Sequence, residues 1–203
     1  MFSKRDDVPI QERLIISIYD ITETWGGMYV KAGYPVIFWD KQYEGDIISD
    51  RFFKEMSGNW DYVYGIISQP PCTHFAVSGA RWWPNISEQD LSTSIALAQM
   101  VLVLKQQCDN LKFWVQENPA GRIERLIPEL AQYRKMSFNP CDFGDPYTKR
   151  TILWGEFNNN LERIPVLPLY GSMMHKVPPG LNRQNIRSKT PEGFARAFFN
   201  ANR

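Results

Sequence analysis

Short apolar runs alternate with segments of helical periodicity along the first two thirds of the chain. Four runs are rich in β-branched and aromatic residues, which favours buried strands; they are 14–19, 35–39, 62–67 and 113–116. Between them, the spacing of apolar residues predicts helices over 25–32, 50–56 and 87–107. This alternation is typical of βαβ units, so we expect an α/β fold with a mostly parallel sheet and helices on both faces.

The strongest helix signal begins at Ser87, a residue type that caps helices, with Asp90 three residues later. Apolar residues then recur at helical spacing to about Gln107. Because apolar residues surround most of this segment, we expect a crossover helix that is buried against the sheet.

The pattern is less regular after Pro119. Residues 136–139 and 151–154 predict a short antiparallel pair that flanks a turn-rich segment. Asparagines and prolines then predict an irregular connector, and Thr190, Pro191 and Glu192 predict the cap of a last helix. Since no repeat or long linker divides the sequence, we expect a single domain over residues 1–203.

Size and composition are those of a globular domain. With 203 residues, of which 43% are hydrophobic and 22% charged, the chain is long enough to bury roughly 70% of the surface of its unfolded state. The charged residues at positions 4–7 do not fit a signal peptide, and the longest apolar stretch, 100–104, is too short to span a bilayer. We therefore expect a cytoplasmic protein without a membrane segment.

Cysteine and histidine are sparse. The three cysteines, Cys72, Cys108 and Cys141, form no CxxC pair, which predicts reduced thiols. The two histidines, His74 and His175, are isolated in the sequence, so we expect no metal site.

The net charge of +1 hides an asymmetry. Residues 1–120 contain 10 basic and 15 acidic residues, whereas the remainder contains 13 basic and 7 acidic ones. Nine cations of the second part are candidates for a phosphate-binding face: Arg122, Arg125, Arg134, Lys135, Lys149, Arg150, Arg183, Arg187 and Lys189. An ordinary solvated surface explains the same charges equally well.

Two reactive side chains follow predicted strands. Cys72 comes after the run 62–67 and two prolines, and Glu117-Asn118-Pro119 follows the run 113–116. Because parallel strands place their carboxyl ends at one edge of a sheet, we expect a thiol, a carboxyl group and an amide to lie close together. A nucleophile beside an acid predicts an enzyme.

Four segments resemble motifs of the DNA cytosine-5 methyltransferases, especially the compact versions encoded by phages and prophages. They are QPPCTHFAVSGARWW (69–83), WVQENPAGRIERL (114–126), NPCDFGDPYTKRTILWGEF (139–157) and PPGLNRQNIRSKTPEGFARAFFNAN (178–202). The resemblance implies a Rossmann-like S-adenosylmethionine-dependent methyltransferase fold without a large target-recognition domain. It also implies a bacterial host cytoplasm if the protein is phage-encoded. The cofactor half and nucleophile loop would occupy 1–83, the acid and basic motifs 84–157, and the connector and last helix 158–203.

The same resemblance implies a chemical role for each motif. Cys72 would add to carbon 6 of an extruded cytosine, so that carbon 5 becomes nucleophilic enough to take a methyl group. Glu117 would hydrogen-bond to ring nitrogen N3 from a dry pocket that raises its pKa. Lys149 and Arg150 would lie near the cytosine carbonyl and a phosphate, and Asn118 would orient Glu117.

S-Adenosylmethionine is the methyl donor that the resemblance implies, bound along the carboxyl ends of the first strands. The residues implied for donor binding are Tyr19, Asp20, Trp25, Asp40, Asp46 and Pro71. The family's glycine-rich turn is replaced here by residues 20–24, and Glu23 would bring a negative charge to the amino-acid end of the donor.

Two further departures concern DNA. Tyr147 stands in place of the family's glutamine and Thr151 in place of its second arginine, which predicts rearranged contacts to the base. Fewer than twenty residues separate Trp154 from Gly171, where the family has its large target-recognition region. We therefore expect relaxed or very short sequence specificity, or a partner protein that directs the enzyme to its target.

Two other functions are compatible with this sequence. Thymidylate synthase-like proteins use a Pro-Pro-Cys thiol on free pyrimidine nucleotides, although the strand that ends at Asp40 and the Glu-Asn-Pro motif suit a donor-binding fold better. A non-catalytic relative that binds DNA or protein would explain the altered donor turn.

Overall fold

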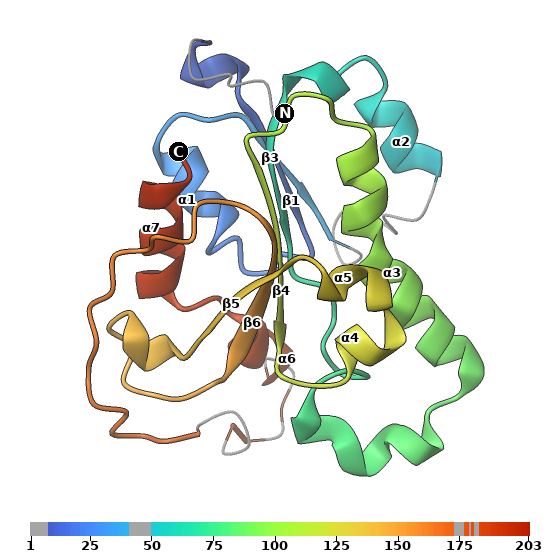
Figure 1. Cartoon of the computed structure of the whole chain (residues 1–203), viewed down its shortest axis with the longest axis vertical. Coiled ribbons are helices and arrows are strands. Elements are labelled where there is room, and N and C mark those ends of the chain that lie inside the picture. The colour runs from blue at the N-terminus through green and yellow to red at the C-terminus, as the bar shows by residue number, and fades with distance from the viewer. Residues whose placement is uncertain (1–7, 41–49, 173–176, 179, 181–182) are drawn as a thin grey trace.

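The computed structural model describes residues 8–40, 50–172, 177, 178, 180 and 183–203 (Figure 1). Its strands are β1 (Leu14–Ile18), β2 (Val36–Trp39), β3 (Val63–Ser68), β4 (Phe113–Pro119), β5 (Arg134–Phe138) and β6 (Thr151–Glu156). Its α-helices are α1 (Gly26–Lys31), α2 (Asp50–Met56), α3 (Glu88–Gln106), α4 (Ile123–Leu126), α5 (Pro128–Ala131), α6 (Arg183–Ser188) and α7 (Glu192–Ala201). Four short 3-10 segments are η2 (Ile10–Glu12), η3 (Trp60–Tyr62), η4 (Val77–Asn85) and η5 (Pro140–Asp142).

The strands form one six-stranded sheet in the order β2-β1-β3-β4-β6-β5. Strands β1 to β4 are parallel, and β6 runs antiparallel to both β4 and β5. Every residue of β1 and β3 is buried, as expected for parallel strands that are covered on both faces. The predicted α/β class, with a mostly parallel sheet, is confirmed.

Helices cover both faces of this sheet (Figure 1). On one face, α1 and α7 pack over an aromatic core in which Trp25 meets Phe194 and Phe198 edge-on, each with ring centroids 4.9 Å apart. On the other face, α2 and α3 bury Phe52 and Val101 against the sheet. The two faces therefore have separate hydrophobic cores, and burial on both sides stabilises the central strands.

Helix α3 confirms the expected crossover helix. The Ser87 hydroxyl accepts a hydrogen bond from the Asp90 N–H, which satisfies a helix N-terminal donor. The Ser87 hydroxyl also donates to the Asp90 carboxylate at 2.6 Å. Apolar residues then bury against β3 and β4 up to Leu104.

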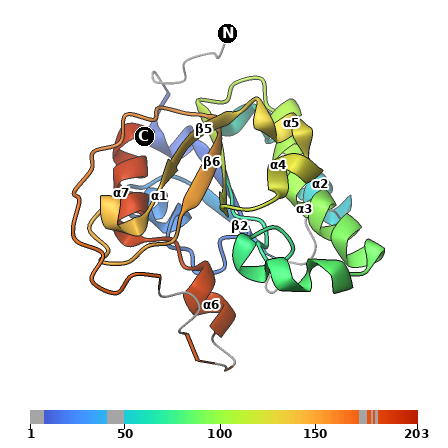
Figure 2. The same cartoon turned by 60° about the horizontal axis from the view of Figure 1, so that its bottom comes forward.

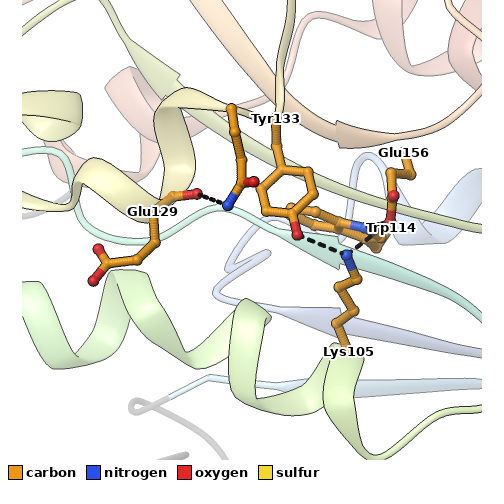
Figure 3. Close-up of polar contacts among 6 residues, drawn as sticks. Lys105, Trp114, Glu129, Tyr133 and Glu156 are labelled. Carbon is orange, nitrogen blue, oxygen red and sulfur yellow. Dashed lines mark hydrogen bonds and ion pairs between the residues drawn. The ribbon is translucent and has the colours of Figure 1, made fainter.

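A polar cluster fixes the far end of α3 to the sheet (Figure 3). Lys105 Nζ lies 2.9 Å from the Glu156 carboxylate and donates to the Tyr133 hydroxyl at 3.2 Å. The same ammonium lies between two rings, 4.3 Å from the Tyr133 centroid and 5.0 Å from the Trp114 centroid. Trp114 also donates its indole N–H to Glu156 at 2.6 Å. The cluster holds α3, β4 and β6 together at the end of the sheet opposite the carboxyl ends of the parallel strands.

Most predicted elements are present, with two differences. Strand β4 continues through Glu117, Asn118 and Pro119, beyond its expected end, because these residues pair with β6. The expected cap of the last helix is wrong at Thr190: its hydroxyl donates to the Gln69 side chain at 2.6 Å, and α7 begins after Pro191 without a side-chain cap.

The segment between β6 and α6 contains no helix or strand among its described residues, which run to residue 172 and include 177, 178 and 180. This agrees with the irregular connector that was expected there. Within the described part of the chain, no helix combines the length and the apolar character needed to cross a membrane.

Candidate active site

Three motifs meet at the carboxyl edge of the parallel strands. Cys72 follows β3, and Glu117 and Asn118 are among the last three residues of β4. Because β6 runs antiparallel to β4, with Thr151 opposite Pro119, the start of β6 lies at this same edge. Lys149 and Arg150, which precede β6, are therefore carried to the thiol and the acid by sheet topology.

The Cys72 loop is attached to the end of β4. Asn118, which is buried, donates its side-chain N–H to the Pro70 carbonyl at 2.9 Å. Ala76 then forms a β-bridge with Gly121. A β-carbon at Gly121 would overlap the Phe75 carbonyl, so only glycine permits this close approach of the two loops. Asn118 thus positions the nucleophile loop, and the role expected for it, orienting Glu117, stays a prediction.

On its other side, the end of β4 holds the basic motif. The Ala120 N–H donates to the Arg150 carbonyl at 2.9 Å. Lys149 Nζ donates to the Arg187 carbonyl in α6 at 3.2 Å. Lys149 is partly buried, whereas Arg150 is exposed. The two cations differ in setting: Lys149 lies within the site, and Arg150 lies at its rim.

The pKa of Cys72 depends on its burial and on the charges around it. Burial raises the pKa of this thiol, the positive charges of Lys149 and Arg187 lower it, and the negative charge of Glu117 raises it. These charges act on the sulfur only because the structure brings Cys72, Glu117 and Lys149 together. The expected proximity of thiol and acid is therefore present, and the catalytic roles of these residues remain predictions.

Glu117 is partly buried near the end of β4. Burial raises the pKa of its carboxyl group, and the charge of Lys149 opposes that rise. Among the described residues, no side chain or backbone group hydrogen-bonds to this carboxyl. In its protonated form, which burial favours, this carboxyl group is able to donate a hydrogen bond to a ligand.

Tyr147 adds a phenol hydroxyl that is able to donate a hydrogen bond. Burial, with the charges of Asp145 and Glu117, raises the pKa of its phenol to about 12. The phenol is protonated at all physiological pH values, and it is close enough to Glu117 for the two charges to interact. The residue that departs from the family pattern therefore still presents a polar group to the site.

Two residues that were expected to bind the methyl donor, Asp20 and Asp40, follow strands β1 and β2. Asp20 is buried, accepts hydrogen bonds from the Gly26 N–H at 2.8 Å and the Ser17 hydroxyl at 3.2 Å, and so holds the start of α1. Burial raises the pKa of Asp20, and its second carboxylate oxygen has no partner among the described residues. Asp40 follows β2 and is partly exposed.

The turn between Tyr19 and Trp25 adopts backbone angles that usually require glycine. Tyr19 has φ 63° and Glu23 has φ 51°, both in the left-handed region. The Glu23 N–H donates to the Asp20 carbonyl at 2.8 Å, and the Gly27 N–H donates to the Glu23 carbonyl at 2.9 Å. The chain thus makes a tight turn here with larger residues, which costs about 1–2 kcal/mol for each.

The other expected donor residues differ in position. Trp25 is fully buried and packs against α7, which explains the large apolar side chain at this position. A contact between Trp25 and the methyl donor stays a prediction. Pro71 is exposed beside Cys72. Asp46 lies outside the described residues.

A hollow of about 440 Å³ opens beside this turn. It is bordered by the turn, by one side of α1 and by the start of α7. Its lining residues are Thr22, Glu23, Thr24, Gly27, Met28, Lys31, Lys189 and Glu192. Acidic and basic side chains therefore line the same space.

The structure identifies polar residues at this edge that the sequence did not single out as functional. The side-chain oxygen of Gln69 accepts a hydrogen bond from the Thr190 hydroxyl, and its backbone N–H donates to the Ile18 carbonyl at 3.1 Å. Gln69 therefore connects the Cys72 loop with β1 and with the residues that precede α7. Ser68 donates to the Gln116 side chain at 3.2 Å between the buried ends of β3 and β4. Gln69 begins the Pro-Pro-Cys segment, and that adjacency was the signal available in the sequence.

The nine cations of the second part of the chain do not form one face. Arg134 and Lys135 start β5, at the sheet end opposite the site, and Arg134 pairs with Glu124 at 3.0 Å. Lys189 pairs with Glu192 at 3.0 Å. Lys149, Arg150, Arg187 and Arg122 are the members of this set that the structure places at the carboxyl edge. The charge of Arg187 acts on Cys72, and Arg122 donates to the His74 carbonyl at 2.9 Å.

His74 forms a hydrogen bond between its Nδ1 and the Ser94 hydroxyl at 2.7 Å. Cys108 is buried, and burial raises the pKa of its thiol to about 12. Within the described residues, no three His, Cys, Asp or Glu side chains are grouped so as to hold a metal ion.

Comparison with known proteins finds similarity among solved structures, whereas no family model and no curated protein matches the chain. A protein described as a DNA modification methyltransferase encoded within an E. coli prophage matches with 13% identity and a TM-score of 0.46, over 70% of this chain and 46% of that one. The Entamoeba histolytica methyltransferase EhMeth matches with 13% identity and a TM-score of 0.49, over 84% and 61%. The S. pombe Dnmt2 methyltransferase matches with 12% identity and a TM-score of 0.41, over 70% and 48%.

Each of these three matches has a sequence identity of 13% or less and a TM-score below 0.5. The chain spans about half to three fifths of the length of each. Activity, substrate and partners are therefore argued below from the residues of the site.

Proposed function

We propose that this protein is an S-adenosylmethionine-dependent DNA cytosine-5 methyltransferase. One observation carries the proposal: at one edge of the sheet, the Cys72 thiol lies within the electrostatic influence of a partly buried acid, Glu117, and of a cation, Lys149. The chemistry of methylating carbon 5 of cytosine needs a nucleophile, an acid and a positive charge, and these are the three groups present.

The residues near β1 and β2 fit the proposed methyl donor. The donor is a nucleoside joined through a cationic sulfonium to a zwitterionic amino-acid end, and the hollow beside the 20–24 turn has a comparable size and carries charges of both signs. Glu23 would pair with the donor ammonium, Lys189 or Lys31 with its carboxylate, and Asp40 with its ribose hydroxyls. When bound, the donor supplies an electrophilic methyl group on a sulfonium.

Cys72 is the proposed nucleophile. Its proton must leave before the sulfur attacks, and burial opposes that loss while Lys149 and Arg187 favour it. The thiolate forms a bond to carbon 6 of cytosine, and the electrons of the 5,6 double bond move toward N3 and make carbon 5 nucleophilic. After carbon 5 has taken the methyl group, which leaves the donor as a neutral thioether, water accepts the carbon 5 proton. The 5,6 double bond then re-forms as the carbon–sulfur bond breaks, and Cys72 is released as a thiolate.

Glu117 is the proposed acid. Its raised pKa keeps a proton available for N3, where electron density develops during the attack. A protonated Glu117 also removes the negative charge that raises the pKa of Cys72. Acid and nucleophile are thus coupled: neutral Glu117 favours both the hydrogen bond to the base and the formation of the thiolate.

The target base must be outside the helical stack, because a thiol at the edge of a sheet cannot reach carbon 6 of a stacked cytosine. Lys149 and Arg150 would contact the base carbonyl and an adjoining phosphate. With so little chain between β6 and α6, readout of base edges is expected to be short or to depend on a partner protein.

The decisive experiment is expression in a methylation-free host, followed by mass spectrometry of nucleosides from its DNA and, separately, its RNA. We expect 5-methylcytosine in the DNA with the wild-type protein and none with Cys72→Ser. Calorimetry should show that Cys72→Ser binds S-adenosylmethionine as the wild type does. Product formed by Cys72→Ser would remove this residue from the mechanism, and donor binding without any product would favour a non-catalytic relative.

A further inference from the structure

An exposed tryptophan lies in the loop segment that follows the proposed nucleophile, ten residues after Cys72. The chain has seven tryptophans, all within the described residues. Four of them are buried, and two are partly buried. Trp82, in segment η4, exposes 58% of its surface. An exposed aromatic ring does not gain the free energy that burial provides, so packing in the core does not explain a tryptophan at this position.

Segment η4 is firmly attached to the site although none of its residues is buried. The Val77 N–H donates to the Ala120 carbonyl at 3.1 Å, and the Gly79 N–H donates to the Ala76 carbonyl at 2.9 Å. Figures 1 and 2 show the segment, in green, at the same end of the molecule as α6, beyond the carboxyl ends of the strands. The start of the segment that carries Trp82, five residues after Cys72, is therefore fixed to the loop that follows β4.

Arginines surround this part of the segment. The Arg81 guanidinium lies 4.9 Å from the centroid of Trp82, and the Arg122 guanidinium lies 4.3 Å from the centroid of Trp83. Arg122 also donates to the His74 carbonyl at 2.9 Å, which anchors it to the nucleophile loop. The acidic residues nearest in sequence, Glu88 and Asp90, belong to the first turn of α3, and Asp90 is engaged by the Ser87 hydroxyl.

We propose that Arg81 and Trp82 form a stacking platform for an unpaired base of the nucleic acid strand whose cytosine reaches Cys72. An aromatic face stacks on any base, and a neighbouring guanidinium adds attraction to the phosphates and to the ring itself. The proposal rests on the proposed function and names its substrate form: single-stranded nucleic acid. A strand without a complement also explains how a chain with a short connector reaches its target base without opening a duplex.

The platform is tested by fluorescence anisotropy with a labelled, cytosine-containing 12-nucleotide DNA strand, the matching RNA strand and the DNA duplex. We expect Trp82→Ala to weaken single-strand binding about 5- to 100-fold and Trp82→Phe to retain most of it. Arg81→Ala should also lower the slope of log affinity against log salt by about 1. The two single strands decide between DNA and RNA as the bound strand.

Leu167→Ala is the matched control, because Leu167 is an apolar residue with 76% exposure in the connector. It should leave strand binding unchanged, and circular dichroism with thermal unfolding should show all variants folded as the wild type. The platform is overturned if the wild type binds no single strand, if Trp82→Ala binds as the wild type does, or if Leu167→Ala weakens binding equally. Preference of the wild type for the duplex, with the same Trp82 effect on both forms, would overturn the single-strand assignment.

The two proposals fail separately. If no 5-methylcytosine forms but strand binding depends on Trp82, the platform stands and the proposed activity falls. If methylation proceeds and Trp82→Ala changes neither strand affinity nor KM for the strand, the activity stands and the platform falls.

Discussion

At the sulfur of Cys72, burial and nearby charge act in opposite directions. Burial has the largest effect and raises the pKa of the thiol, and Glu117 raises it further, whereas Lys149 and Arg187 lower it. In the protein alone, the thiol form is therefore favoured at neutral pH. Reactivity at this position should respond to each neighbouring charge with a defined sign.

The first prediction concerns alkylation of Cys72 by iodoacetamide at pH 8. Glu117→Gln should speed the reaction about 3- to 10-fold, because it removes a negative charge that disfavours the thiolate, and Lys149→Met should slow it. In contrast, methylation by Glu117→Gln should fall about 10²- to 10⁴-fold, because the acid is lost. Mass spectrometry of the Cys72 peptide follows alkylation separately from Cys108 and Cys141.

Lys149→Arg is the control for this prediction, since it keeps the charge and should keep the alkylation rate near that of the wild type. Equal alkylation rates in wild type, Glu117→Gln and Lys149→Met would show that these charges do not act on the sulfur.

The second prediction concerns stability and pH. The folded-state pKa of Glu117 is raised by burial, so the neutral form is favoured in the folded protein and stability is lost as pH rises from the ordinary glutamate range through the raised pKa. Glu117→Gln lacks this loss, and at pH 8 it should be more stable than the wild type by about 1 kcal/mol or more. Near pH 4 the difference should vanish. Urea unfolding at both pH values measures it, and a difference independent of pH would contradict the assignment.

At the scale of elements, the turn between β1 and α1 is the place where sequence and backbone disagree. The resemblance expects glycine here, and the structure retains two left-handed residues, Tyr19 and Glu23, without it. The exposed Glu23 tests what this strain costs, because its side chain can be changed with little effect on packing.

The third prediction follows from that strain. Glu23→Gly should raise the free energy of unfolding by about 0.5–1 kcal/mol, because relief of a left-handed conformation exceeds the entropy cost of glycine. Glu23→Ala removes the same charge but keeps a β-carbon, so it should not stabilise. Chemical denaturation compares the two. If Ala stabilises as much as Gly, charge and not backbone strain explains the gain.

The element boundaries that differ most from the prediction are those that depend on contacts with residues distant in the sequence. Periodicity predicted α3 closely because its own residues contain the capping signal and the apolar spacing. Strand β4 was predicted too short because Glu117 and Asn118 are polar, and only their pairing with β6 extends the strand through them. Thr190 has the sequence signature of a cap, yet the distant Gln69 competes for its hydroxyl.

At the scale of the whole molecule, α7 closes the sheet face that lies next to the proposed donor site. Phe194 stacks on Phe138 with centroids 4.1 Å apart, and Phe198 contacts Trp25 and Phe113. The last helix of the chain therefore completes the core that the first helix begins, and the fold depends on contacts between its two ends.

The fourth prediction tests this closure. Phe198→Ala should cost about 3–5 kcal/mol of unfolding free energy, because a fully buried ring is removed from the core. Ile186→Ala in α6, which is 54% exposed, should cost less than about 0.5 kcal/mol. Thermal unfolding measures both. A loss below 1 kcal/mol for Phe198→Ala would show that α7 contributes little to the core.

The sequence by itself predicted the strands of the sheet and the helices α1, α2, α3 and α7, because apolar periodicity and capping residues are local, whereas it did not predict α4, α5 and α6. It also predicted Cys72 and Glu117 as candidate catalytic residues, since they stand after strongly apolar runs. Only the tertiary structure decided that reversed strand β6 delivers Lys149 to that pair, that Asn118 and Gly121 bind the two loops together, and that the nine cations divide between opposite ends of the sheet. Strand order and direction follow from the simultaneous burial of both sheet faces, which no local stretch of sequence specifies.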